Sequence, residues 1–435
     1  MTAELPDSRE ITVGALARVE GEGAMKVVVQ DGRVAGVELR IYEPPRFFEA
    51  MLRGRRFTEA LDITARICGI CPVAYIMSAT NAMEAACGAE PTAEIDRLRR
   101  LVYCGEWLES HGLHVIALHA PDFLGYEGIV DMAADHRELV ERGLRVKKAG
   151  NEVIAALGGR EVHPVNLKVG GVYRAPSRRE LAPLRDVLAP AREDALELLR
   201  WAGTLDYPDH ERDYVFVALR HPDEYAIQRG RIVSSTGLDI APAEYEQHFT
   251  EEHVAHSTAL HSRMAGDDRA YLVGPLARWA LNGDQMAPLA REAAAAAGLE
   301  PACRNPFRSL LVRCAEMVHA LDEALALLDG YEPPDPAAVP ADPHGATGHG
   351  ATEAPRGLLY QRYDLGEDGL IRAAKIVPPT SQNQRSIEED LAGVAAANLS
   401  AGQDALRHVC EQSIRNYDPC ISCATHFLTL EVEGA

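Results

Sequence analysis

"ARICGICPVAYIMSA" at residues 65–79 and "NYDPCISCATHFLTLEVEGA" at residues 416–435 are the two stretches that decide the fold. Each carries a Cys-x-x-Cys pair, and about 350 residues separate the two pairs. A Cys-x-x-Cys turn places two sulfur atoms close enough to bind one soft metal ion, so two turns offer four thiolates, which suit zinc, iron–sulfur or nickel. The spacing alone leaves three interpretations open: a structural zinc site, two unrelated turns, or one composite catalytic site.

Composition excludes several classes of function. The chain has 435 residues and a net charge of −21, which argues against a nucleic-acid surface. An apolar content of 47% is ordinary for a soluble globular protein. The segment "MTAELPDSRE" shows no signal peptide, and no apolar run reaches the roughly 18 residues of a membrane span. We therefore expect a cytoplasmic protein whose remaining cysteines are buried free thiols: Cys87, Cys104, Cys303, Cys314 and Cys410.

Hydrophobic periodicity predicts an α+β fold that is mostly helical, with small sheets at its edges, in one domain over residues 1–435. The sequence predicts a β-hairpin over about 11–42 that turns at Asp31-Gly32, a helical core over about 45–330, a Pro/Gly loop at 332–352, and a C-terminal hairpin with a metal-binding segment at 353–426. The second hairpin turns near Gly366–Gly369. Long helices are predicted at 72–88, at 92–120 with Pro121 ending the helix, and at about 130–157, 178–203 and 303–328.

The residues around the cysteines carry a resemblance. "RICGIC" at 66–71 and "DPCISCATH" at 418–426 resemble the signatures R-x-C-G-x-C and D-P-C-x-x-C-x-x-H of the large subunit of nickel–iron hydrogenases. Further similar stretches spread over most of the chain: "ARVEGEG" (17–23), "PPRFFEAMLRGR" (44–55), "SHGLHVIALHAPD" (110–122), "EAPRG" (353–357) and "KIVPPTSQN" (375–383). The resemblance implies the fold of that subunit and one shared site for the two pairs.

The resemblance also implies a reaction and its metal ligands. Cys68 and Cys420 correspond to terminal nickel ligands, while Cys71 and Cys423 bridge nickel to an iron that carries carbon monoxide and cyanide. Soft thiolates suit both metals. The implied activity is reversible heterolytic cleavage of H2, in which Glu20 takes the proton from the sulfur of Cys420 and passes it towards solvent. Outside this motif, Glu20 would be interpreted as a solvated turn carboxylate.

A polar shell above the metals follows from the same resemblance. Arg356 corresponds to a guanidinium beside the open metal position, and Asp122 and Asp418 correspond to the aspartates that hold it. The alternative is an ordinary salt-bridge network, which is common in a chain as charged as this one.

Two further contacts are implied. Glu49 and His426 correspond to ligands of a hard cation near the C-terminus, magnesium or iron, which takes oxygen ligands and keeps waters. Pro378 belongs to the segment that contacts a cyanide. The hydroxyl residue expected after Val-Pro is replaced here by Pro379, which cannot donate, so Thr380 is the candidate donor.

Three other positions depart from the family pattern. Tyr75 stands where many members have a histidine four residues after the second cysteine. Glu22 replaces the histidine after R-V-E-G, and Gln361 stands where a histidine is frequent. Tyr75, "CPVAY" and the short chain are most similar to the cytoplasmic, multi-subunit, NAD(P)-linked branch.

The sequence places the other redox groups elsewhere. No Gly-x-Gly-x-x-Gly follows a predicted strand, and no cluster-binding run of cysteines remains once four are assigned, so iron–sulfur clusters and flavin or NAD(P) belong on partner subunits. The implied partners are an iron–sulfur small subunit, diaphorase subunits, nickel-insertion chaperones and a protease that removes residues 427–435. The alternatives are a structural zinc-binding protein and a non-catalytic scaffold subunit of a redox complex. The scaffold relatives have lost the metal cysteines, whereas this chain keeps four.

Overall fold

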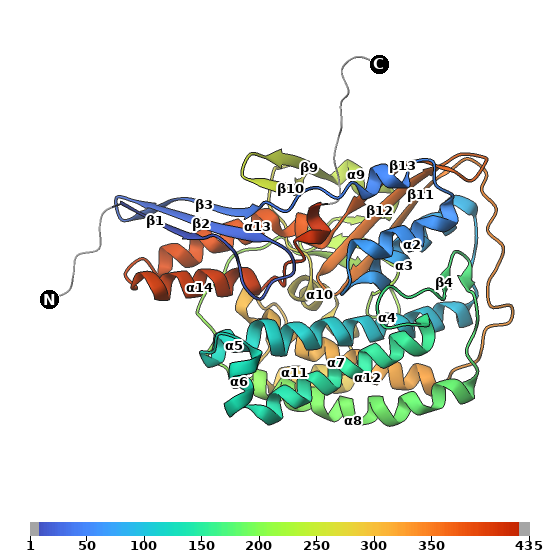
Figure 1. Ribbon diagram of the computed structural model, residues 1–435, viewed down its shortest axis with the longest axis horizontal. Helices are drawn as coiled ribbons and strands as arrows, with labels where there is room; N and C mark the ends of the chain where they lie inside the picture. The colour runs from blue at the N-terminus through green and yellow to red at the C-terminus, as the bar shows by residue number, and fades with distance from the viewer. Residues whose placement is uncertain (1–7, 426–435) are drawn as a thin grey trace, which may run out of the picture.

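A computed structural model describes residues 8–425. A layer of long helices forms the main body of the protein (Figure 1). In α8 (Arg178–Ala202), Leu181, Leu184 and Leu188 are buried and recur every three or four residues, which gives the helix one apolar face. Such faces pack together in four neighbouring helices: α8, α4 (Ala93–Leu113), α7 (Arg137–Gly158) and α12 (Ser309–Asp329). The prediction of a mostly helical α+β fold is confirmed.

Helix α3 (Pro72–Cys87) connects this layer to an antiparallel sheet of β11 (Thr347–Ala354), β12 (Gly357–Leu365) and β13 (Ile371–Val377). The sheet lies directly on the helix. A Cβ atom at Gly350 would lie only 2.1 Å from the carbonyl oxygen of Ser78, so only glycine fits there. This contact fixes the helix that begins immediately after Cys71.

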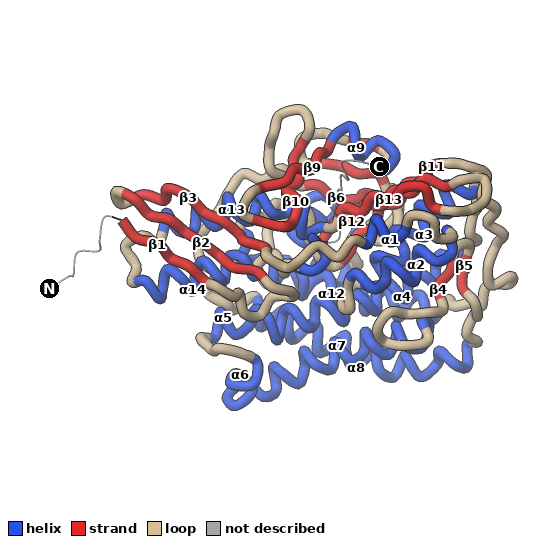
Figure 2. The backbone as a smooth tube through the Cα atoms, turned by 45° about the horizontal axis from the view of Figure 1, so that its top comes forward, coloured by secondary structure: helices blue, strands red, loops and turns tan. Residues whose placement is uncertain are grey.

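A second antiparallel sheet extends from one end of the molecule (Figure 2). It consists of β1 (Ser8–Val13), β2 (Gly23–Gln30) and β3 (Arg33–Ile41), and it contacts α13 (Pro379–Ala397) and α14 (Gln403–Arg415). The predicted turn at Asp31-Gly32 is confirmed, because both residues have positive φ and connect β2 to β3. The predicted hairpin gains a third strand, since β1 pairs with β2 from Ser8 onward.

Shorter elements complete the described chain. The helices are α1 (Phe48–Leu52), α2 (Ala60–Thr64), α5 (Ala120–Leu124), α6 (Ile129–Asp135), α9 (Tyr245–His248), α10 (Pro275–Asn282) and α11 (Pro288–Ala296). The strands are β4 (Leu167–Lys168), β5 (Gly171–Val172), β6 (Val217–Arg220), β7 (Arg231–Ser234), β8 (Asp239–Ile240), β9 (Phe249–Val254) and β10 (Ser257–Met264). Short 3-10 turns include η2 (Ala65–Ile67) and η7 (Ser422–Thr425).

The prediction that Pro121 ends the helix over 92–120 is wrong. Helix α4 begins as expected after Thr92, whose side chain accepts a hydrogen bond from the backbone of Ile95. The chain then widens into a π-helical turn at His114–His119 and continues into α5. Pro121 lies in the first turn of α5, where its missing N–H group is no loss.

Three other boundaries differ from prediction. His136 (φ −122°, ψ 41°) separates α6 from α7, so the helix over 130–157 is two helices. The helix predicted from 303 begins at Ser309, because Pro306 starts a separate 3-10 turn. The loop predicted over 332–352 is wrong from Thr347 onward, because β11 uses glycines for close packing on α3 rather than for flexibility.

The C-terminal hairpin turns where expected: the backbone of Gly369 donates to the carbonyl of Gly366 at 2.9 Å. The five single cysteines are buried free thiols, as predicted. Within residues 8–425, none of the helices is long and apolar enough to span a membrane.

Candidate metal centre

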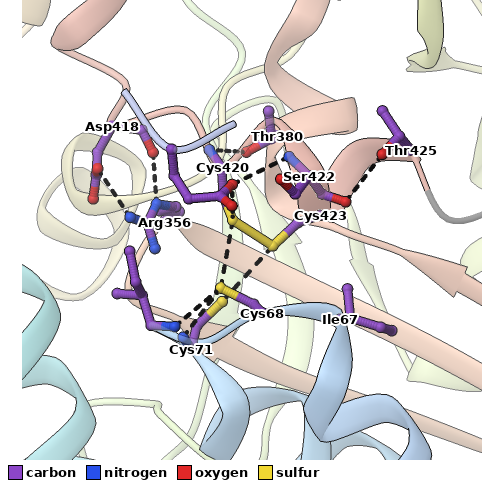
Figure 3. The surroundings of a disulfide bond; sticks show 12 residues. Ile67, Cys68, Cys71, Arg356, Thr380, Asp418, Cys420, Ser422, Cys423 and Thr425 are labelled. Atoms are coloured by element: carbon purple, nitrogen blue, oxygen red, sulfur yellow. Dashed lines mark hydrogen bonds and ion pairs between the residues drawn. A yellow bond between two sulfur atoms is a disulfide. The ribbon is translucent and has the colours of Figure 1, made fainter. Parts of the chain in front are cut away.

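The two Cys-x-x-Cys pairs meet in the interior of the protein (Figure 3). Cys68 Sγ lies 3.5 Å from Cys420 Sγ, and Cys71 Sγ lies 3.9 Å from Cys423 Sγ, although each of these partners is 352 residues away in the sequence. All four sulfurs lie within 4.8 Å of one another, and none of the four residues is more than 3% exposed. Cys420 and Cys423 are joined by a disulfide, so a metal ion could take these two sulfurs only after their reduction to thiolates.

The first pair is organised by a helix start. Cys71 is the N-cap residue of α3, and Pro72 occupies the first helical position, where proline is favoured. The backbone N–H groups of Ile70 and Cys71 both donate to Cys68 Sγ at 3.3 Å. Hydrogen bonding from the Cys71 side chain lowers the pKa of Cys68, the charge of Arg356 adds to this effect, and burial opposes it. Cys68 is therefore the member of the pair that loses its proton first.

A buried glutamate holds the same helix start. Glu106 of α4 accepts hydrogen bonds from the backbone N–H groups of Val73 and Ala74, at 2.5 and 3.0 Å. Burial raises the pKa of Glu106 well above its usual value, and these two hydrogen bonds lower it. Sequence reasoning missed this residue. The only hint in the sequence is that Glu106 is the one charged residue in the run 101–108 of this helix.

The second pair is held by a loop near the N-terminus. The backbone N–H of Ile421 donates to Glu20 O at 2.9 Å, and the N–H of Ser422 donates to Glu20 Oε2 at 3.1 Å. The same Oε2 lies 3.0 Å from Cys420 Sγ. Gly21 has φ +87°, and a Cβ atom there would lie 2.9 Å from the nitrogen of Ser422. Glycine at this position therefore allows the carboxylate of Glu20 to approach the sulfur of Cys420.

Arg46 joins the two cysteine segments directly. Its Nη2 donates to the carbonyl of Ile67 at 2.7 Å and also to the carbonyl of Ser422. Its backbone N–H donates to the carbonyl of Thr425 at 2.7 Å. Nothing in the sequence indicates this role, because the arginine belongs to neither cysteine motif.

Arg356 and Asp418 form a buried ion pair beside the sulfurs (Figure 3). Arg356 Nε donates to the carbonyl of Asp418 at 2.6 Å, and Nη2 donates to its Oδ1 at 3.0 Å. Burial opposes the guanidinium charge, but Asp418, Cys71 and Cys68 outweigh burial and raise the pKa of Arg356. Among the described residues Arg356 Nη1 has no hydrogen-bond partner, so this donor remains available to a ligand.

A second buried arginine fixes the segment that leads to Arg356. Arg278 of α10 donates to the carbonyls of Ala354 and Pro355, at 3.0 and 2.9 Å. It also forms ion pairs with Glu316 at 2.7 Å and Glu353 at 3.0 Å. The turn between β11 and β12 is thereby anchored to helix α12.

Asp122 does not join the Arg356 pair. Its carboxylate binds Arg415 through two hydrogen bonds, at 2.7 and 2.8 Å, and also contacts Arg18 at 2.5 Å and His119 at 3.1 Å. Burial opposes ionisation of Asp122, but His119 and Arg415 outweigh it and lower the pKa. The expectation that two aspartates hold Arg356 is therefore wrong for Asp122. This residue belongs to the salt-bridge network that was the alternative interpretation.

Glu49 lies in α1, where its Oε1 accepts a hydrogen bond from the backbone of Ile376 at 2.8 Å. Burial raises the pKa of Glu49 to about 7, which a nearby cation would counteract. The second predicted ligand, His426, and the tail 427–435 lie outside the described residues.

Of the three residues that depart from the family pattern, Gln361 has a structural role. Tyr75 is buried in α3, and its hydroxyl has no hydrogen-bond partner within residues 8–425. Gln361 Nε2 donates to the carbonyl of Tyr75 at 3.1 Å, and its Oε1 accepts from Tyr363 at 2.5 Å. Gln361 therefore joins β12 to α3, whereas Glu22 is exposed.

Thr380 contacts the second cysteine pair through its side chain. Pro378 precedes α13 and Pro379 occupies its first position, so Thr380 lies in the first turn. Its Oγ1 accepts a hydrogen bond from the backbone of Cys420 at 3.0 Å.

We expect Thr380→Val to lower the free energy of unfolding by about 1–3 kcal/mol, because a buried N–H group loses its acceptor. Thr380→Ser keeps the hydroxyl and is expected to lose less, and Thr12→Val on the exposed face of β1 provides the control. Chemical denaturation measures all three. Equal stability of Thr380→Val and the parent would show that this hydrogen bond contributes nothing.

Comparison with known proteins agrees with this arrangement. The family model of nickel-dependent hydrogenases matches residues 46–143. Sulfhydrogenase 1 subunit alpha of Pyrococcus furiosus is 34% identical over 431 residues, covering 97% of this chain and 98% of that protein. The NAD-reducing hydrogenase HoxS subunit beta of Cupriavidus necator is 28% identical over 97% of this chain and 95% of that protein.

Solved structures give the same result. A NAD+-reducing [NiFe]-hydrogenase in the H2-reduced state superposes with a TM-score of 0.86 at 28% identity, covering 97% of this chain and 100% of that chain. A [NiFeSe]-hydrogenase of Dm. baculatum superposes with a TM-score of 0.79 at 22% identity, covering 96% of this chain and 100% of that chain, a likeness of fold. The chain, whose four cysteines converge, therefore belongs to the nickel-dependent hydrogenase family and is a large subunit of these oxidoreductases, which act on hydrogen.

Proposed function

We propose that this chain holds a nickel–iron pair on Cys68, Cys71, Cys420 and Cys423 and catalyses the reversible heterolytic cleavage of H2. The observation that carries the proposal is the convergence of four buried sulfurs with the carboxylate of Glu20 3.0 Å from Cys420 Sγ. A soft ligand set and a proton acceptor therefore lie side by side.

The residues present fit such a centre. Four sulfurs match the preference of nickel and low-spin iron for soft ligands, and the unpartnered Nη1 of Arg356 provides a fixed donor for a small polar ligand such as cyanide. When bound, the metals supply the open position at which H2 is split and the acceptor for its electrons. Pro378 and Thr380 would contact the diatomic ligands from the start of α13.

Glu20 would move the proton. Its Oε2 lies within hydrogen-bond distance of Cys420 Sγ, and the backbone N–H of Ser422 holds the carboxylate in place. Ser422 Oγ in turn donates to Glu43 Oε2 at 2.9 Å, so Ser422 connects Glu20 to a second half-buried carboxylate. Arg356, held by Asp418, would keep a positive charge beside the sulfurs throughout the reaction.

A hard cation, magnesium or iron, would bind Glu49 and His426. The buried carboxylate of Glu49 supports this assignment, because a divalent ion favours its charged form. The cation would connect α1 to the C-terminal segment.

Electrons would leave through an iron–sulfur small subunit and continue through flavin-containing diaphorase subunits to NAD(P). The similarity to NAD-reducing hydrogenases supports this route. We propose a cytoplasmic assembly, maturation with nickel-insertion chaperones, removal of residues 427–435 by a protease, and one structural domain over the whole chain.

Infrared spectroscopy with metal analysis of the purified complex tests the proposal. We expect about one nickel and one non-cluster iron per large subunit, with bands from carbon monoxide and cyanide. Zinc as the sole bound metal would support the structural alternative, and absence of any metal at the four cysteines would support the scaffold alternative. Reduction of NAD+ or NADP+ by H2, compared with reduction of a viologen dye, tests the acceptor separately.

A further inference from the structure

A second group of metal-binding side chains lies away from the four cysteines. His256 occupies the turn between β9 and β10, His261 lies on β10, and Glu388 lies on α13. His256 Nε2 is 2.7 Å from Glu388 Oε1, and His261 Nδ1 is 3.9 Å from Glu388 Oε2. The three residues thus bring a hairpin turn, a strand and a helix to one point.

The separations suit a tetrahedral ion. Each residue offers one ligand atom, and these atoms all lie within 4.8 Å of one another. Bonds of about 2.0–2.2 Å to a tetrahedral zinc ion place neighbouring ligand atoms about 3.3–3.6 Å apart. The distances to the two oxygens of Glu388, 2.7 Å from His256 and 3.9 Å from His261, lie on either side of this range, so side-chain rotation would bring both nitrogens and one oxygen to the geometry.

Burial also favours a ligand at this point. His261 is 2% exposed, and its Nδ1 atom, which faces Glu388 Oε2 at 3.9 Å, makes no hydrogen bond with the described residues. A buried imidazole usually satisfies its polar atoms, so this one lacks an expected contact. The side chains of His256 and Glu388 remain 24% and 16% exposed, which leaves a route for an ion and a water molecule.

The surrounding charges are compatible with a cation. The backbone N–H of Leu39 donates to Glu388 Oε1 at 2.9 Å and orients the carboxylate. Glu38 adds negative charge near Glu388. Arg385 adds positive charge near His261, but it is paired with Asp268 at 3.0 Å.

We propose that His256, His261 and Glu388 form a second, mononuclear site for a divalent transition-metal ion of the zinc class, with water as the fourth ligand. Two histidines and one glutamate are a ligand set that zinc accepts in proteins. The ion would connect β10 to α13, the helix whose first turn carries the Thr380 contact to Cys420. The ion would bind independently of what the cysteines hold.

Cobalt(II) titration of the purified complex, after dialysis against a mild chelator, tests the site. Cobalt(II) replaces zinc in such sites, and its visible absorption reports the ligands. We expect about one slowly exchanging Co2+ per large subunit. Its visible spectrum should be that of a tetrahedral ion and should lack the intense thiolate bands of cysteine ligation.

Three variants locate the binding. His261→Ala and His256→Ala should each weaken Co2+ binding by at least about tenfold, because one of three protein ligands is lost. His253→Ala, on the exposed part of the same hairpin, should bind as the parent does. His256→Ala, at a half-exposed position, keeps the test informative if His261→Ala fails to fold. No Co2+ bound by the parent, equal binding by all variants, or thiolate bands alone would each overturn the proposal.

Discussion

Replacing Cys420 by alanine is expected to abolish hydrogen activity and the retention of nickel. The change removes one of four converging sulfurs, the one that lies 3.5 Å from Cys68 Sγ and 3.0 Å from the carboxylate of Glu20. A soft anionic ligand is then lost from the nickel position, and the proton acceptor loses its neighbour. Metal analysis by mass spectrometry and H2-dependent dye reduction, on the same preparation, measure both effects.

Cys87→Ala is the matched control. Cys87 is a free thiol at the far end of α3, 9% exposed and outside the four-sulfur group. Its replacement should leave nickel content and turnover close to those of the parent. Stoichiometric nickel and parental turnover in Cys420→Ala would mean that the two pairs do not share a centre.

Glu20→Gln is expected to keep the metals but to slow turnover by about 100-fold or more, because an amide cannot relay a proton. Glutamine preserves the size of the side chain, and the backbone contact between Glu20 and Ile421 does not depend on the carboxylate. Measurements of kcat, of the kcat solvent isotope effect and of the infrared spectrum separate slow proton transfer from loss of the centre.

Glu22→Gln removes a carboxylate two residues away on the same loop, where the side chain is exposed. Turnover of this control should equal that of the parent. Should Glu20→Gln also turn over at the parental rate, the proton leaves the centre by another route.

The part of the site that could be predicted consists of residues within short chemical signatures. Cys68, Cys71, Cys420 and Cys423 lie in two such strings, and Glu20 lies in a third, so their chemistry was visible without coordinates. The structure brings all five together.

Residues that support the site through long-range pairing could not be predicted. Arg46 and Glu106 act on backbone groups of other segments, and nothing in their own neighbourhoods indicates the partner. Asp122 lies in a recognisable stretch, yet its partner is chosen by the packing of α14, which brings Arg415 closer than Arg356. Sequence reasoning identified the residue but assigned it to the wrong ion pair.

For the fold too, features set by local sequence signals could be predicted and features set by long-range packing could not. Helical periodicity and turn residues located α8 and the Asp31-Gly32 turn, because both signals are local. The sequence places Gly350 in a predicted loop, because close packing on α3 and chain flexibility select the same amino acid.

The convergence of sulfurs 352 residues apart also has a consequence for the order of assembly. Loop-closure entropy grows slowly, by about 0.6 kcal/mol per doubling, so closing this loop instead of one of roughly 20 residues costs only about 2.5 kcal/mol more. The larger penalty is kinetic, because contacts between distant segments form late. A growing chain exposes Cys68 and Cys71 long before Cys420 leaves the ribosome, and during that interval it offers a metal ion only two sulfurs. Nickel supplied at the end of folding would meet all four, so the timing of delivery would help to select the metal.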